Sequence, residues 1–493
     1  MARAKKEAAL TPEERLQAAL IPDWEWPYKL PENWCWIKAS SIINIYTGNS
    51  INEKVKAEKY AGQPKGLLFI ATKDIGFDNA VNYETDVRIP DYSNFKTAPA
   101  NTALLCIEGG SAGRKVGFVE QTVCFGNKLC AFATEKVNSK YIYYVLQSQC
   151  FVDQFNSKKH GLIGGVSVGD LTEIAFMIPP LAEQQRIVDR IESLFAKLDE
   201  AKEKAQAVVD SFETRKAAIL HKAFNGELTA NWREEHNAVK NTVLADIKDY
   251  SSVWQAKDRR FLSEEQAKSE VVVIDNGHEW VKCTIGAVSR VTNGSTPSRK
   301  EPKYWNGSIS WISSGEVRNN IIEGSNECIS KEGYINSSVK LLPAGTVLIA
   351  MIGEGKTRGQ SAILSIEATI NQNIAAIVVE HNCILPHYIW YWLQMNYAKN
   401  REKGSGSGPQ ALNCQRVREL DFFVPNQEEQ TEIVNILQKA LEKEQQAKEA
   451  AEAVLDQIDM MKKSILARAF RGELGTNDPT DEPAVELLKR IFS

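Results

Sequence analysis

The sequence PPLAEQQRIV at residues 179–188 decides the fold, because a related sequence, PNQEEQTEIV, recurs at residues 425–434. The two copies are offset by 246 residues. The same offset relates KAFNGEL at residues 222–228 to RAFRGEL at residues 468–474. Since no insertion or deletion separates these anchors, the chain contains a duplicated segment of fixed length, which indicates an internal repeat.

A weaker repeat extends upstream of each fixed-length segment. It is carried by WIK at 36–38 with WVK at 280–282, TALLC at 102–106 with TVLIA at 346–350, and YIYYVLQ at 141–147 with YIWYWLQ at 388–394. The offset is 244 residues for the first two pairs and 247 for the third, so small insertions separate these anchors. Each half therefore has a divergent region followed by a region of fixed length.

Length and composition set limits on the class of protein. A chain of 493 residues predicts two to four domains, and 43% hydrophobic with 25% charged residues is typical of a globular protein. The net charge of −4 does not by itself indicate nucleic-acid binding, which usually brings a basic excess. Nine scattered cysteines without a C-x-x-C pair predict reduced, mostly buried thiols. With neither a signal peptide nor a membrane-length apolar run, we expect a soluble, cytoplasmic protein.

Each fixed-length segment reads as one long helix. Apolar and small residues recur at alternating steps of four and three, which is a heptad seam. The large apolar seam residues are Ile187, Ile191, Leu194, Leu198, Val208, Phe212 and Ile219 in the first copy and Ile433, Leu437, Val454, Ile458, Met461 and Ile465 in the second. Helices are predicted from near residue 181 to 224 and from near 427 to 470. At about 1.5 Å per residue, each spans roughly 60–65 Å.

So narrow an apolar stripe needs a partner, and each copy is the obvious partner for the other. The alternative is that each helix packs only on its own domain. Paired helices could run parallel or antiparallel, and a pseudo-two-fold relation between the halves implies the antiparallel arrangement. Small residues near mid-length, such as Ala205 and Ala451, would allow close approach, and Gly226 and Gly472 would end the helices.

The divergent regions have a different sequence pattern, in which short β-type runs alternate with loops rich in Gly, Asn, Ser and Asp. The predicted fold class is α+β: two mixed α/β domains separated by a long antiparallel two-helix coiled coil, with an internal pseudo-two-fold repeat. The divisions are an N-terminal extension with a short helix at 1–29, a first domain at 30–178, a first long helix at 179–228, a connector at 229–271, a second domain at 272–424, a second long helix at 425–474 and a tail at 475–493. The tail allows either docking or disorder.

Two pairs of loops carry candidate ligand contacts. GGSAGRKVG at 109–117 and GEGKTRG at 353–359 each follow an apolar run and each hold two cations. Such loops suit phosphate oxygens or guanine edges, although a solvated turn is the alternative. KKHGLIGG at 158–165 and REKGSGSGPQAL at 401–412 form the second pair, which we interpret as ligand-facing loops, with a flexible linker as the alternative for the latter.

No catalytic constellation is recognisable. The sequence contains no G-x-x-x-x-G-K-[ST], no G-x-G-x-x-G after a strand, no G-x-S-x-G, no H-E-x-x-H and no Asn-Pro-Pro-Tyr or Asp-Pro-Pro-Tyr of amino-methyltransferases. The six histidines are dispersed. We therefore expect neither an active site nor a bound metal in this chain.

Several strings resemble the specificity subunit of type I restriction–modification systems. They are LPENWCW at 30–36, IPPLAEQQRIV at 178–188, AFNGELTANWR at 223–233, GSTPSRKEPKYWNGSISWISSGEV at 294–317 and ILARAFRGEL at 465–474. The resemblance covers nearly the whole chain, in order and in duplicate. The first domain departs from the family's opening motif, because GNSIN at 48–52 lacks the Thr-Pro pair.

The resemblance implies a DNA-binding, phage-defence subunit with two target-recognition domains, each reading one half of an asymmetric bipartite site in double-stranded DNA. The paired helices would set the gap and dock two modification (methyltransferase) subunits, which bring S-adenosylmethionine. Restriction subunits, where present, would add ATP- and Mg-dependent cleavage, so this chain would hold no cofactor and be no enzyme. The candidate DNA contacts are Lys73, Arg114, Lys115, Lys158, Lys159, His160, Ser313, Ser314, Glu316, Arg318, Lys356, Arg358, Ser405, Ser407 and Gln410.

Two other functions are compatible with the same duplicated architecture. One is a sensor or scaffold that binds a protein or a small ligand instead of DNA. The other is an enzyme in which recognition and methylation are fused, and the missing methyltransferase motifs weigh against it.

Overall fold

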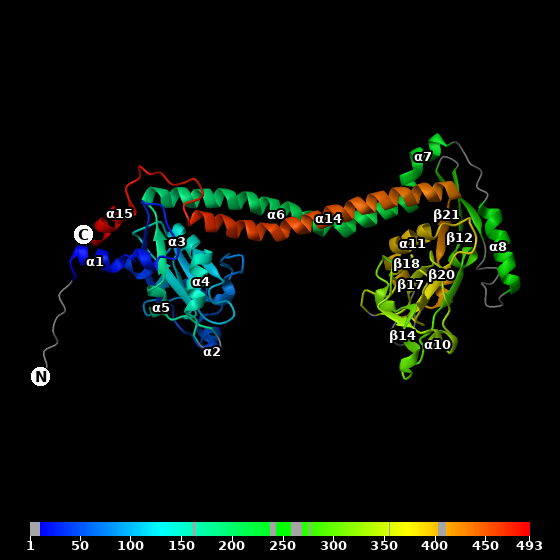
Figure 1. Cartoon of the computed structure of the whole chain (residues 1–493), viewed down its shortest axis with the longest axis horizontal. Helices are drawn as coiled ribbons and strands as arrows, with labels where there is room; N and C mark the ends of the chain where they lie inside the picture. The colour runs from blue at the N-terminus through cyan, green and yellow to red at the C-terminus, as the bar shows by residue number, and fades with distance from the viewer. Residues whose placement is uncertain are drawn as a thin grey trace. The chain divides into compact units, whose positions relative to one another are not determined.

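The computed structural model describes residues 10–160, 164–236, 243–257, 269–275, 278–353, 355–402 and 411–493. The chain divides into two compact units, of which the first is Met1–Gln206 with Glu452–Ser493 and the second is Ala207–Ala451. Each unit contains one mixed α/β domain and a stretch of each of two long helices (Figure 1). The predicted fold class is confirmed.

The long helices are α6 (Leu181–Phe224) and α14 (Gln427–Ala469), within one residue of the predicted bounds. Each helix follows a strand after a short link that contains proline, Pro179 and Pro180 before α6 and Pro425 before α14. Each ends near a left-handed glycine, Gly226 with φ +82° and Gly472 with φ +73°, a conformation that only glycine adopts at little cost.

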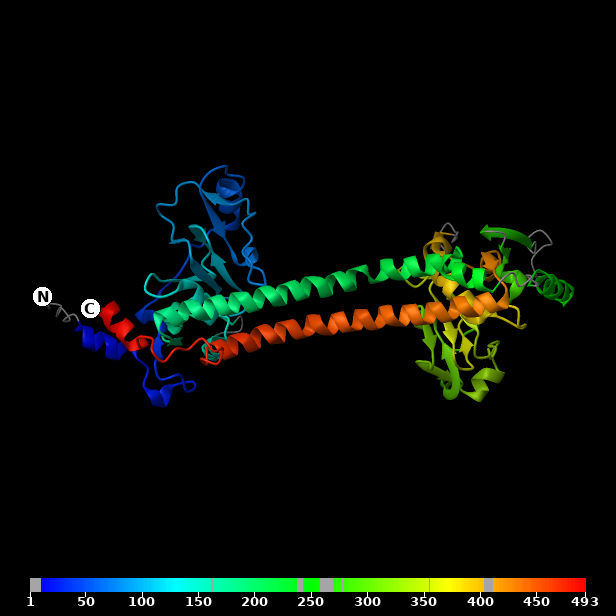
Figure 2. The same cartoon turned by 90° about the horizontal axis from the view of Figure 1, so that it is seen from above.

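The two helices pair antiparallel, as contacts inside each unit show. In unit 1, Lys462 Nζ lies 2.5 Å from Asp199 Oδ1. In unit 2, Arg215 Nε lies 2.7 Å from Glu444 Oε2. A later position on α6 therefore meets an earlier position on α14, and Figure 2 shows the helices side by side within each unit.

The heptad seam differs from the prediction along the second half of α14. Val454 and Met461 are 39% and 45% exposed, whereas Ile458 is 2% exposed. The neighbours Leu455 and Lys462 take the half-buried positions instead. A straight α-helix drifts by about 20° per heptad relative to a strict seven-residue repeat. After several heptads, the residue that follows one of the two seam positions therefore faces the partner helix in its place, as Leu455 does for Val454 and Lys462 for Met461.

Lysine stems complete the shifted seam. Lys448 Nζ lies 4.9 Å from the Phe212 ring centroid, and Lys462 Nζ lies 5.0 Å from that of Phe195. Each ammonium group thus lies within cation–π distance of an aromatic ring on α6, and that of Lys462 also pairs with Asp199. The remaining predicted seam residues are buried at Ile187, Ile191, Phe212, Ile433, Leu437 and Ile458 and half-buried at Leu194, Leu198, Val208, Ile219 and Ile465.

The first domain holds two four-stranded sheets. One has the order β2 (Asn44–Thr47), β9 (Leu129–Ala133), β6 (Thr102–Cys106), β7 (Val116–Val119), and the other β4 (Arg88–Ile89), β3 (Leu67–Ile70), β8 (Val123–Phe125), β5 (Thr97–Ala98). Helices α3 (Ser139–Val145), α4 (Gln149–Ser157) and α5 (Val168–Thr172) follow.

The second domain repeats this plan. Its sheets have the orders β13 (Arg290–Asn293), β20 (Ile374–Val378), β17 (Val347–Ala350), β18 (Ser361–Leu364), β15 (Asn320–Ile322), and β16 (Glu327–Ile329), β14 (Trp305–Ile312), β19 (Thr369–Ile370). Its helices are α9 (Ile285–Val288), α10 (Lys331–Ile335), α11 (Pro386–Met395), α12 (Tyr397–Glu402) and α13 (Cys414–Arg418). β13, β20, β17 and β18 correspond in order to β2, β9, β6 and β7.

An equivalent glycine in each domain shows how closely the two domain backbones agree, although the first domain lacks the Thr-Pro pair. A Cβ on Gly48 would lie 1.9 Å from the Phe125 carbonyl oxygen, and a Cβ on Gly294 would lie 1.9 Å from that of Ile370. The next residue's backbone N–H donates to the same carbonyl in both domains. Both copies therefore need glycine here for the backbones to approach.

A short antiparallel strand pair connects each domain to its long helix. β1 (Cys35–Lys38) pairs with β10 (Ala175–Ile178) in unit 1. In unit 2, β12 (His278–Thr284) pairs with β11 (Glu270–Asp275) on one side and β21 (Asp421–Val424) on the other. The registers Cys35↔Ile178 and Val281↔Val424 are related by the offset of 246 residues. Trp280 therefore corresponds to Trp34, not to Trp36 as the string comparison suggested.

A repeated set of hydrogen bonds fixes the start of each long helix. Trp34 Nε1 donates to Glu183 at 2.8 Å, and Trp280 Nε1 donates to Glu429 at 3.1 Å. The next residue along, Gln184 or Gln430, donates to the carbonyl oxygen of the proline five residues earlier. All four carboxylate and amide side chains are buried, so the hydrogen bonds replace those lost to water.

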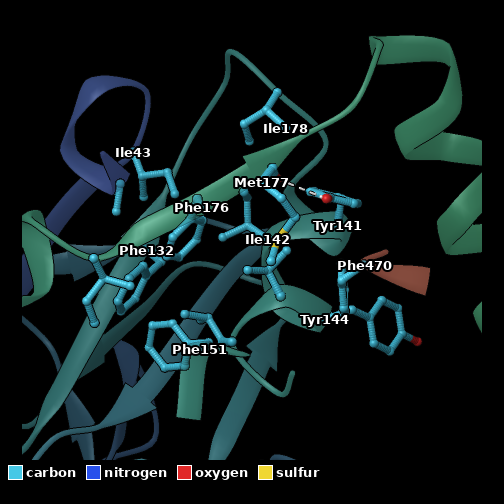
Figure 3. Close-up of a cluster of buried hydrophobic side chains, with 14 of the residues drawn as sticks. Ile43, Phe132, Tyr141, Ile142, Tyr144, Phe151, Phe176, Met177, Ile178 and Phe470 are labelled. Carbon is cyan, nitrogen blue, oxygen red and sulfur yellow. Dashed lines mark hydrogen bonds between the residues drawn. The ribbon is translucent and has the colours of Figure 1, made fainter. Parts of the chain in front are cut away.

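Aromatic side chains form the core of the first domain next to this joint (Figure 3). Phe132 and Phe176 stack with centroids 6.4 Å apart, and Phe151 meets Phe176 edge-on at 5.9 Å. The Tyr141 hydroxyl donates to the Met177 carbonyl oxygen at 3.0 Å, and the Tyr141 ring lies 5.6 Å from that of Phe470. The end of α14 is thus part of the unit 1 core.

The tail docks in unit 1, which selects one of the two alternatives for it. Thr476 and Asn477 donate to the Glu183 carboxylate at 3.3 and 2.9 Å, and Asp481 pairs with Arg186. Helix α15 (Ala484–Phe492) then contacts the predicted short helix, α1 (Pro12–Ala19), whose N-terminus carries a capping box between Thr11 and Glu14. In the connector, α7 (Ala230–Glu235) and α8 (Val243–Lys257) are helical.

All nine cysteines are free thiols, and six of them are buried. Burial raises the pKa of Cys35 and of Cys130 to about 12, so these thiols stay protonated. Among the described helices, none combines the length and the apolar character needed to cross a membrane.

Candidate DNA interface

Three segments of the first domain meet at the end of β6. The glycine loop turns back on the strand, because the Gly113 backbone N–H donates to the Cys106 carbonyl oxygen at 2.8 Å. Lys115 Nζ donates to the Thr72 carbonyl oxygen at 3.2 Å, which joins the loop to the turn after β3. The Val166 N–H donates to the Ile107 carbonyl oxygen at 3.1 Å, which brings in the segment after α4. The structure thus gathers the predicted loops at one place.

The cations of this region differ in exposure. Lys73, on the 3-10 turn η4 (Thr72–Asp74), and Arg114 are exposed, and Lys115 is half-buried. An aromatic side chain that sequence reasoning missed lies beside them. Phe77 is 62% exposed, with the Arg114 guanidinium carbon 5.0 Å and Lys115 Nζ 4.7 Å from its ring centroid.

The candidates after α4 form a separate group. Lys159 Nζ lies 5.5 Å from the Phe155 ring centroid, and His160 Nε2 lies 3.5 Å from Asp170 Oδ2. The hydrogen bond from Ser167 lowers the pKa of Asp170, with smaller contributions from His160 and Lys158. The anionic Asp170 thus offsets part of the positive charge here. Residues 161–163 of this loop lie outside the described residues.

In the second domain the predicted serine–glutamate segment is a capped turn. The Glu316 carboxylate accepts hydrogen bonds from the Ser313 backbone N–H at 2.8 Å and from the Ser313 hydroxyl at 3.0 Å. It also accepts one from the Asn326 N–H at 2.9 Å. Ser313, Ser314 and Glu316 are half-buried. Glu316 therefore holds the backbone, and this internal use of its oxygens argues against it as a base contact.

Arg318 on the same turn is exposed, and its Nε donates to the Gly315 carbonyl oxygen at 2.6 Å. Lys356 is exposed as well, and the Tyr397 hydroxyl donates to its carbonyl oxygen at 2.6 Å. Arg358 departs from the prediction, because its side chain is only 8% exposed. Packing beneath α12, where Arg401 donates to the Arg358 carbonyl oxygen at 2.9 Å, leaves that guanidinium little access to a surface ligand.

The two glycine loops correspond, but their cations do not. Gly113 and Gly359 have φ of +74° and +85°, and each donates its N–H to the carbonyl at the end of the preceding strand. Arg114 and Lys115 follow this glycine in the first loop, whereas Lys356 and Arg358 precede it in the second. Ser405, Ser407 and Gln410 lie outside the described residues, so the second pair of loops is not compared.

The sequence comparisons agree with this geometry. The model of the type I restriction modification DNA specificity domain matches the chain twice, at residues 31–209 and 277–453. The chain belongs to the type I restriction modification DNA specificity family. Each match contains one mixed α/β domain and the start of the helix that follows it.

Curated relatives support the membership over most of the chain. The specificity subunit of the Escherichia coli type I restriction enzyme EcoBI is 21% identical over 93% of this chain and 92% of its own length. That of StySPI from Salmonella potsdam is 23% identical over 94% of this chain and 96% of its own. That of EcoR124I/EcoR124II from Escherichia coli is 31% identical, but over only 33% of this chain and 40% of its own length.

Two solved structures share the fold. The HsdS subunit from Thermoanaerobacter tengcongensis superposes with a TM-score of 0.58 at 15% identity, covering 91% of this chain and 99% of that one. A chain from a study of the assembly and conformational transition of a type I R-M system superposes with a TM-score of 0.62 at 14% identity, covering 91% of this chain and 100% of that one.

Proposed function

We propose that this family member is the DNA-recognition subunit of a type I restriction–modification assembly, and that each domain reads one half of a bipartite site. The observation that carries the proposal is the duplicated DNA specificity domain in which the backbone joints repeat while the exposed loop residues differ. Loops on a rigid scaffold are where proteins place variable recognition. Since the two loop sets differ, the two half-sites differ, and the whole site is asymmetric.

The paired helices act as the spacer between the two readers. Their fixed length supports this role, because inserting a single residue turns the rest of a helix by about 100° and breaks the seam. Ion pairs such as Arg215–Glu444 and Lys462–Asp199 fix the register on the seam. The faces of α6 and α14 that point away from the seam are exposed, and they would dock two modification subunits.

The chemistry belongs to partner subunits in this proposal. The modification subunits would bind S-adenosylmethionine, and restriction subunits, where present, would bind ATP and Mg. The present chain would supply recognition and geometry without catalysis or a cofactor of its own. Because its ligand would be chromosomal and invading DNA, we place the assembly in the cytoplasm.

The test is sequencing of methylated bases in a host that expresses the modification subunits with or without this chain. We expect a gapped, two-part methylation motif that appears only when the chain is present. A host in which no such motif depends on the chain would refute the proposal. Purified complex should also bind DNA with a strong salt dependence, because Lys73, Arg114 and Lys356 are exposed cations suited to phosphates.

A further inference from the structure

The same turn follows the buried end of a strand in both domains. In the first domain it leaves β3, which pairs parallel with β8 through Phe69↔Cys124 and Ile70↔Phe125. In the second it leaves β14, which pairs parallel with β19 through Trp311↔Thr369 and Ile312↔Ile370. The two turns therefore start from the same place in the repeated fold.

An acidic residue fixes the beginning of each turn. The Ala71 N–H donates to Asp74 Oδ2 at 2.8 Å, and the Ser313 N–H donates to Glu316 Oε1 at 2.8 Å. A left-handed asparagine fixes the end. Asn79 has φ +67° and Asn319 has φ +57°, a conformation that asparagine adopts more readily than most residues.

The asparagine side chains tie both turns to the strand that follows the glycine loop. Asn79 Oδ1 accepts from the Val116 N–H at 3.1 Å, at the first residue of β7. Asn319 Oδ1 accepts from the Ser361 N–H at 3.0 Å, at the first residue of β18. Asn79 Nδ2 also donates to Gln147 Oε1 at 2.8 Å. Both turns are thus held at each end by equivalent contacts.

The sequence between these anchors differs in length and in chemistry. Ile-Gly-Phe-Asp at 75–78 stands in the first domain where Val-Arg at 317–318 stands in the second. The first residue of each insert, Ile75 or Val317, is fully buried and continues the core. Phe77 and Asp78 are exposed in the first domain, and Arg318 is exposed in the second.

Phe77 has the properties of a recognition residue. Its ring is 62% exposed, so covering it with a ligand removes apolar surface from water and favours binding. The turn is anchored at both ends and therefore loses little conformational freedom when it binds. Arg114 and Lys115 lie over the ring, where they can meet phosphates on either side of a base contact. The combination suits DNA better than an uncharged partner.

Resting on the function proposed above, we propose that this turn determines specificity in each domain. Phe77 contacts the 5-methyl group of a thymine in the half-site of the first domain, because that methyl is the apolar feature of a base-pair edge in the major groove. Arg318 donates to O6 and N7 of a guanine in the half-site of the second domain. Its Nε is held by the Gly315 carbonyl, which orients the guanidinium and leaves its terminal nitrogens to donate.

The experiment compares methylation motifs for the full assembly carrying Phe77→Ala or Arg318→Ala. We expect F77A to make one T·A position of the first half-site degenerate, with the second half-site and the gap unchanged. R318A should make one G·C position of the second half-site degenerate and leave the first unchanged. Discrimination at the guanine position should fall by about 5- to 150-fold in R318A. At the thymine position it should fall by about fourfold in F77A, because that contact buries a single methyl group. Tyr92→Ala and Lys340→Ala, which remove other exposed side chains of the same domains, should leave the motif intact.

A second measurement isolates the methyl contact. Replacing the implicated thymine by deoxyuridine should weaken binding by the wild-type assembly and leave binding by F77A unaffected. An unchanged motif in both variants would overturn the inference. An F77A variant that binds a methyltransferase subunit more weakly but keeps its motif would overturn it too, because Phe77 would then be a protein contact. If the wild-type chain directs no gapped motif at all, the proposed function itself fails, and this outcome is distinguishable from the others.

Discussion

Glu183 and Glu429 occupy the same place in the two halves of the chain but are compensated differently. Glu429 pairs with Arg233 at 2.5 Å and accepts from the Thr229 hydroxyl at 2.7 Å. Glu183 instead accepts from the neutral groups of Trp34, Thr476 and Asn477. The two halves thus compensate a buried carboxylate at the same backbone position differently, by an ion pair in one and by neutral donors in the other.

This difference predicts unequal effects of the same substitution. Glu429→Gln should lower the free energy of unfolding by about 3–5 kcal/mol, because it leaves the buried Arg233 without its counter-charge. Glu183→Gln should change it by no more than about 1 kcal/mol, since an amide oxygen can accept from the same donors. Urea unfolding followed by tryptophan fluorescence measures both, because Trp34 and Trp280 are direct partners. Equal losses would contradict the assignment.

Glu183 also gives a pH dependence whose sign is fixed. Burial raises the pKa of Glu183 above its usual value of 4.5, so the folded state binds the proton more tightly than the unfolded state. Its contribution to stability is then fully present below pH 4.5 and is lost as the pH rises through the raised pKa. Relative to Glu183→Gln, which cannot titrate, the wild-type chain should gain stability as the pH falls from 7 toward 5. A gain in the opposite direction would show that the pKa is lowered instead.

Single residues also mark the limit of sequence reasoning about the interface. The cations Lys73, Arg114 and Lys356 are exposed where the loops place them. The burial of Arg358 beneath α12 depends on packing between segments distant in sequence, and no spacing reveals it. Phe77 carries no sequence signal, because an isolated phenylalanine usually belongs to a core. Its exposure follows from the anchors on either side, which only the folded chain shows.

The long helices were predictable because their signal is periodic and extends over many turns. The bounds of α6 and α14 follow from the apolar steps, the preceding prolines and the terminal glycines. The seam of α14 was less predictable past Ala451, since Val454 and Met461 are apolar yet exposed. A strict heptad repeat does not distinguish neighbouring residues once the drift of a straight helix accumulates.

The shifted seam can be tested with a matched pair of substitutions on α14. Ile458→Ala should lower the free energy of unfolding by about 2–5 kcal/mol, because it empties a buried position. Met461→Ala should change it by less than about 0.5 kcal/mol, because that side chain is 45% exposed. Denaturant unfolding of the two variants provides the comparison. A larger loss at Met461 than at Ile458 would restore the original heptad assignment.

The role of the helix pair as a spacer predicts a change in the DNA site. Inserting one heptad at matched positions in α6 and α14 keeps the seam in phase and adds about 10 Å of helix. At about 3.4 Å per base pair, the gap in the methylation motif should lengthen by about three base pairs while both half-sites stay the same. A one-residue insertion is the control, because it breaks the seam and should abolish the motif. An unchanged gap after the heptad insertion would exclude the spacer role.

Across the whole molecule, the strand pairs that connect each domain to its long helix repeat, whereas the exposed loops differ. The net charge of −4 averages an acidic tail and an acidic α14 with local clusters of cations, so it does not argue against DNA. The repeat itself was visible in the sequence, whereas the correspondence of Trp34 with Trp280 required the strand registers. The central claim is that each domain recognises its own DNA half-site independently, while the paired helices α6 and α14 set the gap between the half-sites.

The measurement that tests this claim most directly is the methylation motif of a hybrid chain. Residues 30–178 would be replaced by the corresponding segment of another family member, with both long helices and the second domain unchanged. We predict that sequencing of methylated bases will show one new half-site, one unchanged half-site and the original gap. A hybrid that assembles with its modification subunits but changes both half-sites, changes neither, or alters the gap would contradict the account.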